Sequence, residues 1–143
     1  MKPIKIGIAG MGTVASGVVK VLERNQAEIT RRAGRGIEVA VVCERTPGRA
    51  AHLDERGVDV INELSQLASH PDVDIVVELI GGYEPARSFV LEAIANGKHV
   101  VTANKALLAE HGNEIFQAAQ DKGVTVAFEA AVAGGIPVIK ALR

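Results

Sequence analysis

The stretch that decides the predicted fold is residues 4–17, IKIGIAGMGTVASG. A short apolar run leads to Gly10 and Gly12, and helical apolar spacing begins at Thr13. In a dinucleotide-binding unit the first glycine permits a tight turn and the second lets the backbone approach a pyrophosphate. The free N–H groups of the following helix then face the phosphate charge. The order strand, turn, helix therefore predicts nucleotide binding.

The third small residue of this pattern is Ala15, so the spacing is G-x-G-x-x-A. Alanine is the tolerated variant, because its small side chain still permits close packing of helix and strand. A glycine pattern alone is weak evidence, since ordinary turns also match it. The strand before it and the helix after it favour nucleotide binding.

Length and composition favour a single α/β domain. A chain of 143 residues is long enough to bury about two thirds of its unfolded surface. Apolar residues make up 48% of the chain but aromatic residues only 3%, as in parallel strands of Val, Ile and Leu covered by helices. We therefore predict a Rossmann-type α/β fold with a doubly wound, mostly parallel sheet.

Charge and cysteine content exclude several classes of protein. Sixteen basic and seventeen acidic residues give a net charge of −1 without a basic run, so no nucleic-acid partner is expected. The chain has neither a signal-peptide hydrophobic region nor an apolar run near the roughly 18 residues of a membrane span. The sequence predicts a cytoplasmic protein. Cys43, the single cysteine, excludes an intrachain disulfide and is expected in the core.

Predicted strands and helices alternate along the rest of the chain. Helical spacing continues from the glycine turn through residues 13–32, and Gly34 ends it. Further strands are expected at 37–43, 58–61, 72–78, 98–101 and 124–128. Further helices are expected at 49–55, from a cap at Asn62 or Ser65 to about Ser69, from Glu84 and Pro85 to Gly97, and at 106–121 with Leu107, Leu108, Ile115, Phe116 and Ala119 on its buried side.

The residues after the second predicted strand occupy the position that reads the adenosine ribose. Glu44 argues for NAD, because an acidic residue accepts a hydrogen bond from the 2′-hydroxyl. NADP is favoured by Arg45, Thr46 and Arg49, because a guanidinium pairs with a 2′-phosphate. A solvated turn of mixed charge is the third interpretation. Glu44 also lies further from Gly12 than in the usual unit, which a longer first helix would explain.

Other strand ends deliver polar or small residues to the edge where α/β sheets bind ligands. Gly81 and Gly82 follow one strand, either for close approach of the backbone to a ligand or as a plain loop. Thr102 and Lys105 follow the next strand, and Lys105 either is solvated or contacts the ligand. Glu129 begins a small-residue segment whose carboxylate and carbonyl groups suit a hard cation.

A family resemblance is carried by four segments, GMGTVASGV, VVELIGGYEPAR, GKHVVTANKALLAEHG and FEAAVAGGIPVI. Together they resemble the amino-terminal part of homoserine dehydrogenase over the whole chain. VTANKALLAEHG and EAAVAGGIP are far more specific than the motifs that all Rossmann domains share. The family interconverts aspartate semialdehyde and homoserine with NADPH or NADH, in the pathway to threonine and methionine. The resemblance thus implies an NAD(P)-dependent dehydrogenase.

The resemblance also implies roles for individual residues. The cofactor-binding residues that it implies, together with the glycine motif, are Gly10, Met11, Gly12, Thr13, Val14, Arg45, Gly81, Thr102 and Lys105. Lys105 matches a lysine that contacts nicotinamide and substrate, so a catalytic role is implied. A sodium ion is expected at Glu129, Val132, Gly134 and Ile136, through the carboxylate and backbone carbonyls.

The chain departs from the family in two respects. Ala15 replaces a glycine that many relatives have, which should tighten helix packing slightly and still permit binding. The substrate and dimerisation domain of the family, with its second lysine, is absent. We therefore expect residues 1–130 to form the dinucleotide-binding domain and residues 131–143 to begin the next domain. The chain alone should be an inactive monomer, and the complete protein a homo-oligomer that acts on homoserine or aspartate semialdehyde.

Two other functions use the same motifs. A non-catalytic module that senses NAD(P) would need the glycine turn but not Lys105. Another semialdehyde or amino-acid dehydrogenase on the same fold would differ in its response to homoserine. Substitution of Lys105 and a test with homoserine distinguish these alternatives.

Overall fold

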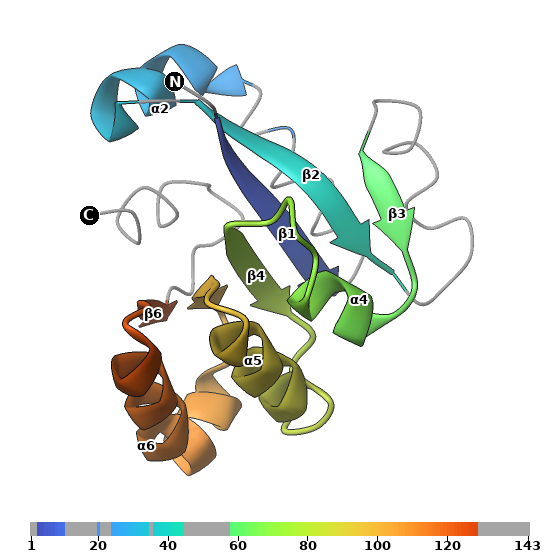
Figure 1. Cartoon of the computed structure of the whole chain (residues 1–143), viewed down its shortest axis with the longest axis vertical. Helices are drawn as coiled ribbons and strands as arrows, with labels where there is room; N and C mark the ends of the chain where they lie inside the picture. Colours follow the sequence, from blue (N-terminus) through green and yellow to red (C-terminus); the bar gives the residue numbers. More distant parts are fainter. Residues whose placement is uncertain (1–2, 11–19, 21–23, 35, 45–57, 129–143) are drawn as a thin grey trace.

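One six-stranded parallel sheet organises the computed structural model, which describes residues 3–10, 20, 24–34, 36–44 and 58–128 (Figure 1). The strands are β1 (Ile4–Gly10), β2 (Ile37–Cys43), β3 (Asp59–Ile61), β4 (Ile75–Leu79), β5 (His99–Thr102) and β6 (Val126–Phe128). The helices are α2 (Gln26–Ala33), α4 (Leu64–Ala68), α5 (Ala86–Ala95) and α6 (Lys105–Lys122). The strand order β3-β2-β1-β4-β5-β6, with all neighbours parallel, confirms the predicted doubly wound fold.

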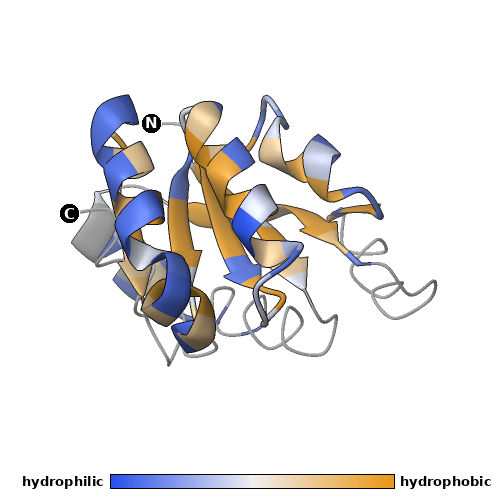
Figure 2. Cartoon of the chain, turned by 90° about the horizontal axis from the view of Figure 1, so that it is seen from below, coloured by the Kyte–Doolittle hydropathy of each residue, from blue (hydrophilic) through white to orange (hydrophobic). Residues whose placement is uncertain are grey.

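The strands are rich in Val and Ile because both faces of the sheet are buried. Ile8 and Val77 belong to the core on one face. Val76 and Val100 belong to the core on the other face, together with side chains of α4, α5 and α6. Figure 2 shows mostly orange, apolar strands, whereas the helices carry both orange and blue residues. Cys43 is buried in the second core, as predicted.

The first predicted helix is not continuous. Asn25 lies in a turn with φ −110° and ψ 20°, and α2 begins at the next residue, Gln26. Asparagine favours turns because its side chain competes for backbone hydrogen bonds. Gly34 ends α2 as predicted, in the left-handed conformation with φ 81°. The prediction of one helix over residues 13–32 is therefore wrong at Asn25.

The predicted caps of the short helix α4 are also wrong. Glu63 occupies the N-cap position with extended dihedral angles, and no side chain caps the helix there. Asn62 lies in the bend directly after β3, one residue too early for a cap. Ser65 lies inside α4, where its carbonyl accepts a hydrogen bond from Ser69.

The predicted buried side of α6 is correct except at one residue. Leu107, Ile115 and Ala119 are buried, but the side chain of Phe116 is 46% exposed. A Cβ atom at Gly112 would lie 3.8 Å from the ring of Phe116. The aromatic ring of Phe116 therefore lies over Gly112, which has no side chain, one turn earlier in the same helix. It does not point into the core.

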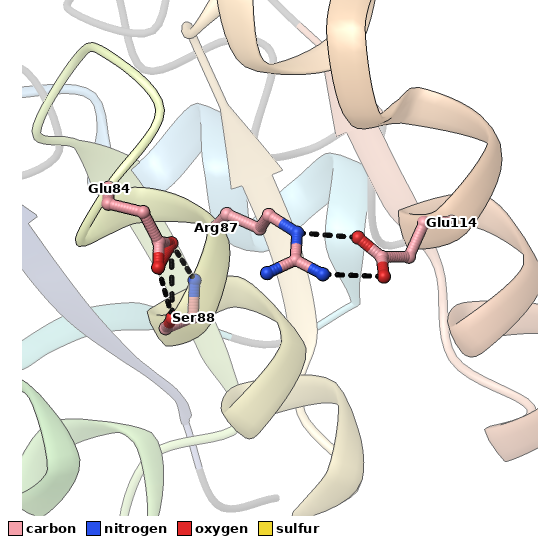
Figure 3. A network of polar contacts seen from close by, with 4 residues as sticks. All are labelled: Glu84, Arg87, Ser88 and Glu114. Atoms are coloured by element: carbon pink, nitrogen blue, oxygen red, sulfur yellow. Dashed lines mark hydrogen bonds and ion pairs between the residues drawn. The ribbon is translucent and has the colours of Figure 1, made fainter.

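An exposed polar network joins the amino-terminal half of α5 to α6 (Figure 3). Arg87 donates two hydrogen bonds of 2.6 Å to the two carboxylate oxygens of Glu114. This contact holds the pKa of Glu114 below its usual range. One turn away, the Ser88 hydroxyl and N–H donate to Glu84, which lowers the pKa of that carboxyl. Because the network is exposed to solvent, it contributes little to the stability of the domain.

Gly7 of β1 allows helix α4 to pack directly on the sheet. A Cβ atom there would lie 2.5 Å from Cδ1 of Leu67 and 3.2 Å from both Cγ atoms of Val73. Leu67 is completely buried and Val73 nearly so. A side chain at position 7 would therefore force these two packed side chains to shift.

Gly7→Ala is therefore expected to lower the free energy of unfolding by about 1–3 kcal/mol, as overpacking of a core does. Gly36→Ala is the matched control, because a Cβ atom there would make ordinary contacts of 3.6 Å or more. Its effect should stay within about 0.5 kcal/mol. Urea denaturation followed by circular dichroism measures both. Equal losses would contradict the packing argument.

Candidate functional site

The carboxyl ends of β1, β4 and β5 meet at one edge of the sheet. Gly10 ends β1, residues 80–82 follow β4, and residues 103–105 follow β5. Because the strands are parallel, these residues are neighbours, and the register pairs Glu78 directly with Thr102. The chain winds outward in opposite directions from β1 and from β4. Open α/β sheets bind ligands at such a switch point.

Gly10 is required by the neighbouring strand. Its φ is 145°, and a Cβ atom would lie 2.7 Å from the backbone carbon and oxygen of Leu79. The sequence predicted a glycine here for a tight turn. The structure adds that the ends of β1 and β4 approach so closely that no side chain fits between them.

Glu78 of β4 is completely buried at this edge. One carboxylate oxygen accepts hydrogen bonds from the N–H groups of Ile80, at 2.8 Å, and Gly81, at 3.1 Å. The other accepts from the Thr102 hydroxyl at 2.6 Å. A buried acid is tolerated only with such donors. Sequence reasoning missed Glu78, although an acid within an otherwise apolar strand is a detectable signal.

Gly81 and Gly82 are glycines because of their backbone conformation. Their φ values are 81° and 71°, in the left-handed region that residues with a side chain rarely adopt. Nothing described lies within 4 Å of a Cβ atom built on either residue. Within the described residues, nothing therefore occupies the side of this turn where side chains would otherwise stand.

Asn104 connects the turn after β5 to the turn after β4. Its side-chain oxygen caps α6 by accepting from the N–H of Leu107 at 3.0 Å. Its amide nitrogen donates to the carbonyl of Gly82 at 2.7 Å. The Asn104 N–H donates to the Thr102 hydroxyl at 3.0 Å. Sequence reasoning did not select Asn104, although asparagine before a helix is an ordinary capping signal.

Lys105 is the first residue of α6 and is exposed at the same edge. Lys98, by contrast, is a buried lysine. Lys98 lies at the opposite end of β5, where its ammonium donates to the carbonyls of His70 and Val73. Burial lowers the pKa of Lys98. Its hydrogen bonds to carbonyls at the amino-terminal edge give it a structural role.

Four of the predicted cofactor-binding residues are described, and the structure brings them to one edge: Gly10, Gly81, Thr102 and Lys105. Met11, Gly12, Thr13, Val14 and Arg45, and the predicted sodium ligands Glu129, Val132, Gly134 and Ile136, lie outside the described residues. Glu44 is nearly buried, and its N–H donates to the carbonyl of Ile61 at 2.9 Å.

The described residues contain neither a candidate metal cluster nor a candidate membrane span. No group of three or more His, Cys, Asp or Glu residues suited to a metal ion is present among them. No helix in the described part of the chain is long and apolar enough to cross a membrane.

The comparison with protein families identifies the chain. The sequence pattern of the family described as "Homoserine dehydrogenase, NAD binding domain" matches residues 10–129. The chain belongs to this family. The resemblance seen in the sequence is therefore confirmed, and with it an NAD(P)-binding domain of Rossmann type.

Individual homoserine dehydrogenases agree with this assignment. The curated protein from Pseudomonas aeruginosa is 61% identical over 143 residues, which are all of this chain and 32% of that protein. The crystal structure from Thiobacillus denitrificans is 59% identical with a TM-score of 0.86, and the match covers 99% of this chain and 32% of that one. The structure from S. aureus at pH 7.0 is 35% identical with a TM-score of 0.80, and the match covers 91% of this chain and 33% of that one. The chain thus spans about a third of the length of these homoserine dehydrogenases.

Thr102→Val tests the buried hydrogen bonds of the site. The substitution keeps the shape of the side chain but leaves the Glu78 carboxylate without its hydroxyl donor, so we expect the free energy of unfolding to fall by about 1–3 kcal/mol. Thr125→Val makes the same change at an exposed position and should have an effect within about 0.5 kcal/mol. Urea denaturation of both variants measures the two changes in the free energy of unfolding. A loss no larger than that of the control would mean that the hydroxyl is dispensable.

Proposed function

We propose that this chain binds NADP or NAD as part of an enzyme that interconverts L-homoserine and L-aspartate 4-semialdehyde. The observation that carries the proposal is the glycine-lined edge at the β1–β4 switch point in a chain of the homoserine dehydrogenase family. The homoserine dehydrogenases that the chain matches support this substrate pair.

The described residues fit a dinucleotide. In a doubly wound sheet one mononucleotide half binds on each side of the switch point, with the pyrophosphate at the first turn after a strand. We assign Gly10 and residues 11–14 to the pyrophosphate and Arg45 to the adenosine end. We assign Gly81, Thr102 and Lys105 to the nicotinamide side. Because the Thr102 hydroxyl is already bonded to Glu78 and Asn104, Thr102 contributes through the turn that it fixes.

Within this proposal Lys105 is the catalytic residue. The bound nicotinamide supplies the hydride chemistry. The exposed ammonium of Lys105 stabilises the negative charge that develops on the substrate oxygen, or contributes its proton. Glu78 takes no part in proton transfer, because it is buried and its two oxygens accept three hydrogen bonds.

The remaining assignments follow from the sequence. We propose a sodium ion at Glu129, Val132, Gly134 and Ile136, because carboxylate and carbonyl oxygens are the ligands that hard cations prefer. We propose that residues 1–130 form the dinucleotide-binding domain and that residues 131–143 begin a substrate domain. We also propose that the complete enzyme is a homo-oligomer whose dimer contacts lie in that second domain.

Fluorescence titration of this chain with NADPH and with NADH tests cofactor binding. We expect saturable binding of both and a preference for NADPH of about tenfold or more, because charge-assisted hydrogen bonds to a phosphate contribute about 1.5–3 kcal/mol. Arg45→Gln should remove the preference, whereas Arg24→Gln, on the segment before α2, should leave it. Absence of binding of either cofactor would overturn the proposal.

Lys105→Ala tests the catalytic assignment in the enzyme that contains its substrate domain. We expect kcat to fall by about 10²–10³-fold, as when a group that stabilises a developing charge is removed. The thermal midpoint should be unchanged, because the side chain is exposed. Lys122→Ala, in the last turn of the same helix, is the matched control. An unchanged kcat would favour a non-catalytic, nucleotide-sensing module.

A further inference from the structure

The turns after β4 and β5 are joined by a closed ring of hydrogen bonds. The N–H of Gly81 donates to the Glu78 carboxylate, which also accepts from the Thr102 hydroxyl. That hydroxyl accepts from the N–H of Asn104, whose side-chain amide donates to the carbonyl of Gly82. The ring therefore returns to the Gly81–Gly82 turn from which it started. Its distances lie between 2.6 and 3.1 Å.

The three side chains of this ring are turned inward. Glu78 is fully buried, Thr102 is 1% exposed and Asn104 is 7% exposed. The carboxylate, the hydroxyl and the amide are each bonded to protein atoms. They are therefore placed to hold the two turns, and none of the described residues lies against the side-chain positions of the two glycines.

Consecutive glycines need such support. Without side chains, Gly81 and Gly82 have more conformational freedom than any other pair of residues. Fixing that freedom opposes binding if it happens only when the ligand arrives. In this structure both glycines are held from their two ends, Gly81 through its N–H and Gly82 through its carbonyl. These two hydrogen bonds therefore restrain the turn from within the protein.

We propose that Glu78 and Asn104 are positioning residues that preset the Gly81–Gly82 turn for the nicotinamide half of the dinucleotide. The inference rests on the proposed function. The ring joins β4 and β5, which lie on the nicotinamide side of the switch point, whereas the adenosine half lies over β1 and β2. Loss of the ring should therefore weaken binding of the whole dinucleotide and spare its adenosine half.

Asn104→Ser is the first variant. Serine is as good an N-cap as asparagine, so the start of α6 is kept. Its shorter side chain has no amide N–H to reach the carbonyl of Gly82. Glu78→Gln is the second variant, in which the same shape presents an NH₂ group to donors that need an acceptor. Glu114→Gln is the matched control, nine residues beyond Lys105 along α6 and exposed.

The measurement is the dissociation constant of each chain for NADPH and for 2′-phospho-ADP-ribose, which lacks the nicotinamide. We expect both variants to bind NADPH about tenfold more weakly, as when a glycine must be ordered on binding. Binding of 2′-phospho-ADP-ribose should change by less than about twofold, and Glu114→Gln should bind both ligands as the parent chain does. A purely structural role would weaken both ligands equally.

The outcomes separate the two proposals. An unchanged ratio of the two constants in Asn104→Ser overturns the positioning role, even if Glu78→Gln fails to fold. Equal affinity of the parent chain for NADPH and 2′-phospho-ADP-ribose overturns it as well. If the parent chain binds neither ligand, the proposed function fails and this inference fails with it.

Discussion

The buried carboxylate of Glu78 is the constraint on which the binding edge depends. An acid inside an apolar sheet destabilises the fold unless donors surround it. The donors here are two N–H groups of the turn after β4 and a hydroxyl from β5. Satisfying this carboxylate therefore fixes the shape of the turn and the pairing of β4 with β5 together. The same three hydrogen bonds therefore stabilise the sheet and hold the turn at its edge.

The central strand β1 meets a second requirement, which is close approach. Gly7 admits helix α4 on one face, and Gly10 admits the end of β4 beside it. A side chain at either position would separate elements that are within contact distance. The switch point is thus built from a strand whose glycines let its neighbours come near.

The sequence predicted what depends on local pattern and missed what depends on distant partners. Apolar runs and glycine stops identified the strands, and strand ends identified Gly81 and Lys105. The contacts of Glu78 with Thr102 and of Asn104 with Gly82 could not be predicted, because only the folded register brings these residues together. Phe116 was misplaced since periodicity does not show that a ring covers its own helix at residue 112.

Asn104 fixes where the backbone of Lys105 lies relative to the glycine turn. One end of its amide caps α6, and the other holds the carbonyl of Gly82. Lys105 is the next residue along the chain, so its backbone is fixed relative to the glycine turn through one short side chain. The distance between the backbone of Lys105 and the glycine turn is thus set by a neutral, buried residue. The proposed site therefore depends on residues that do not themselves face the ligand.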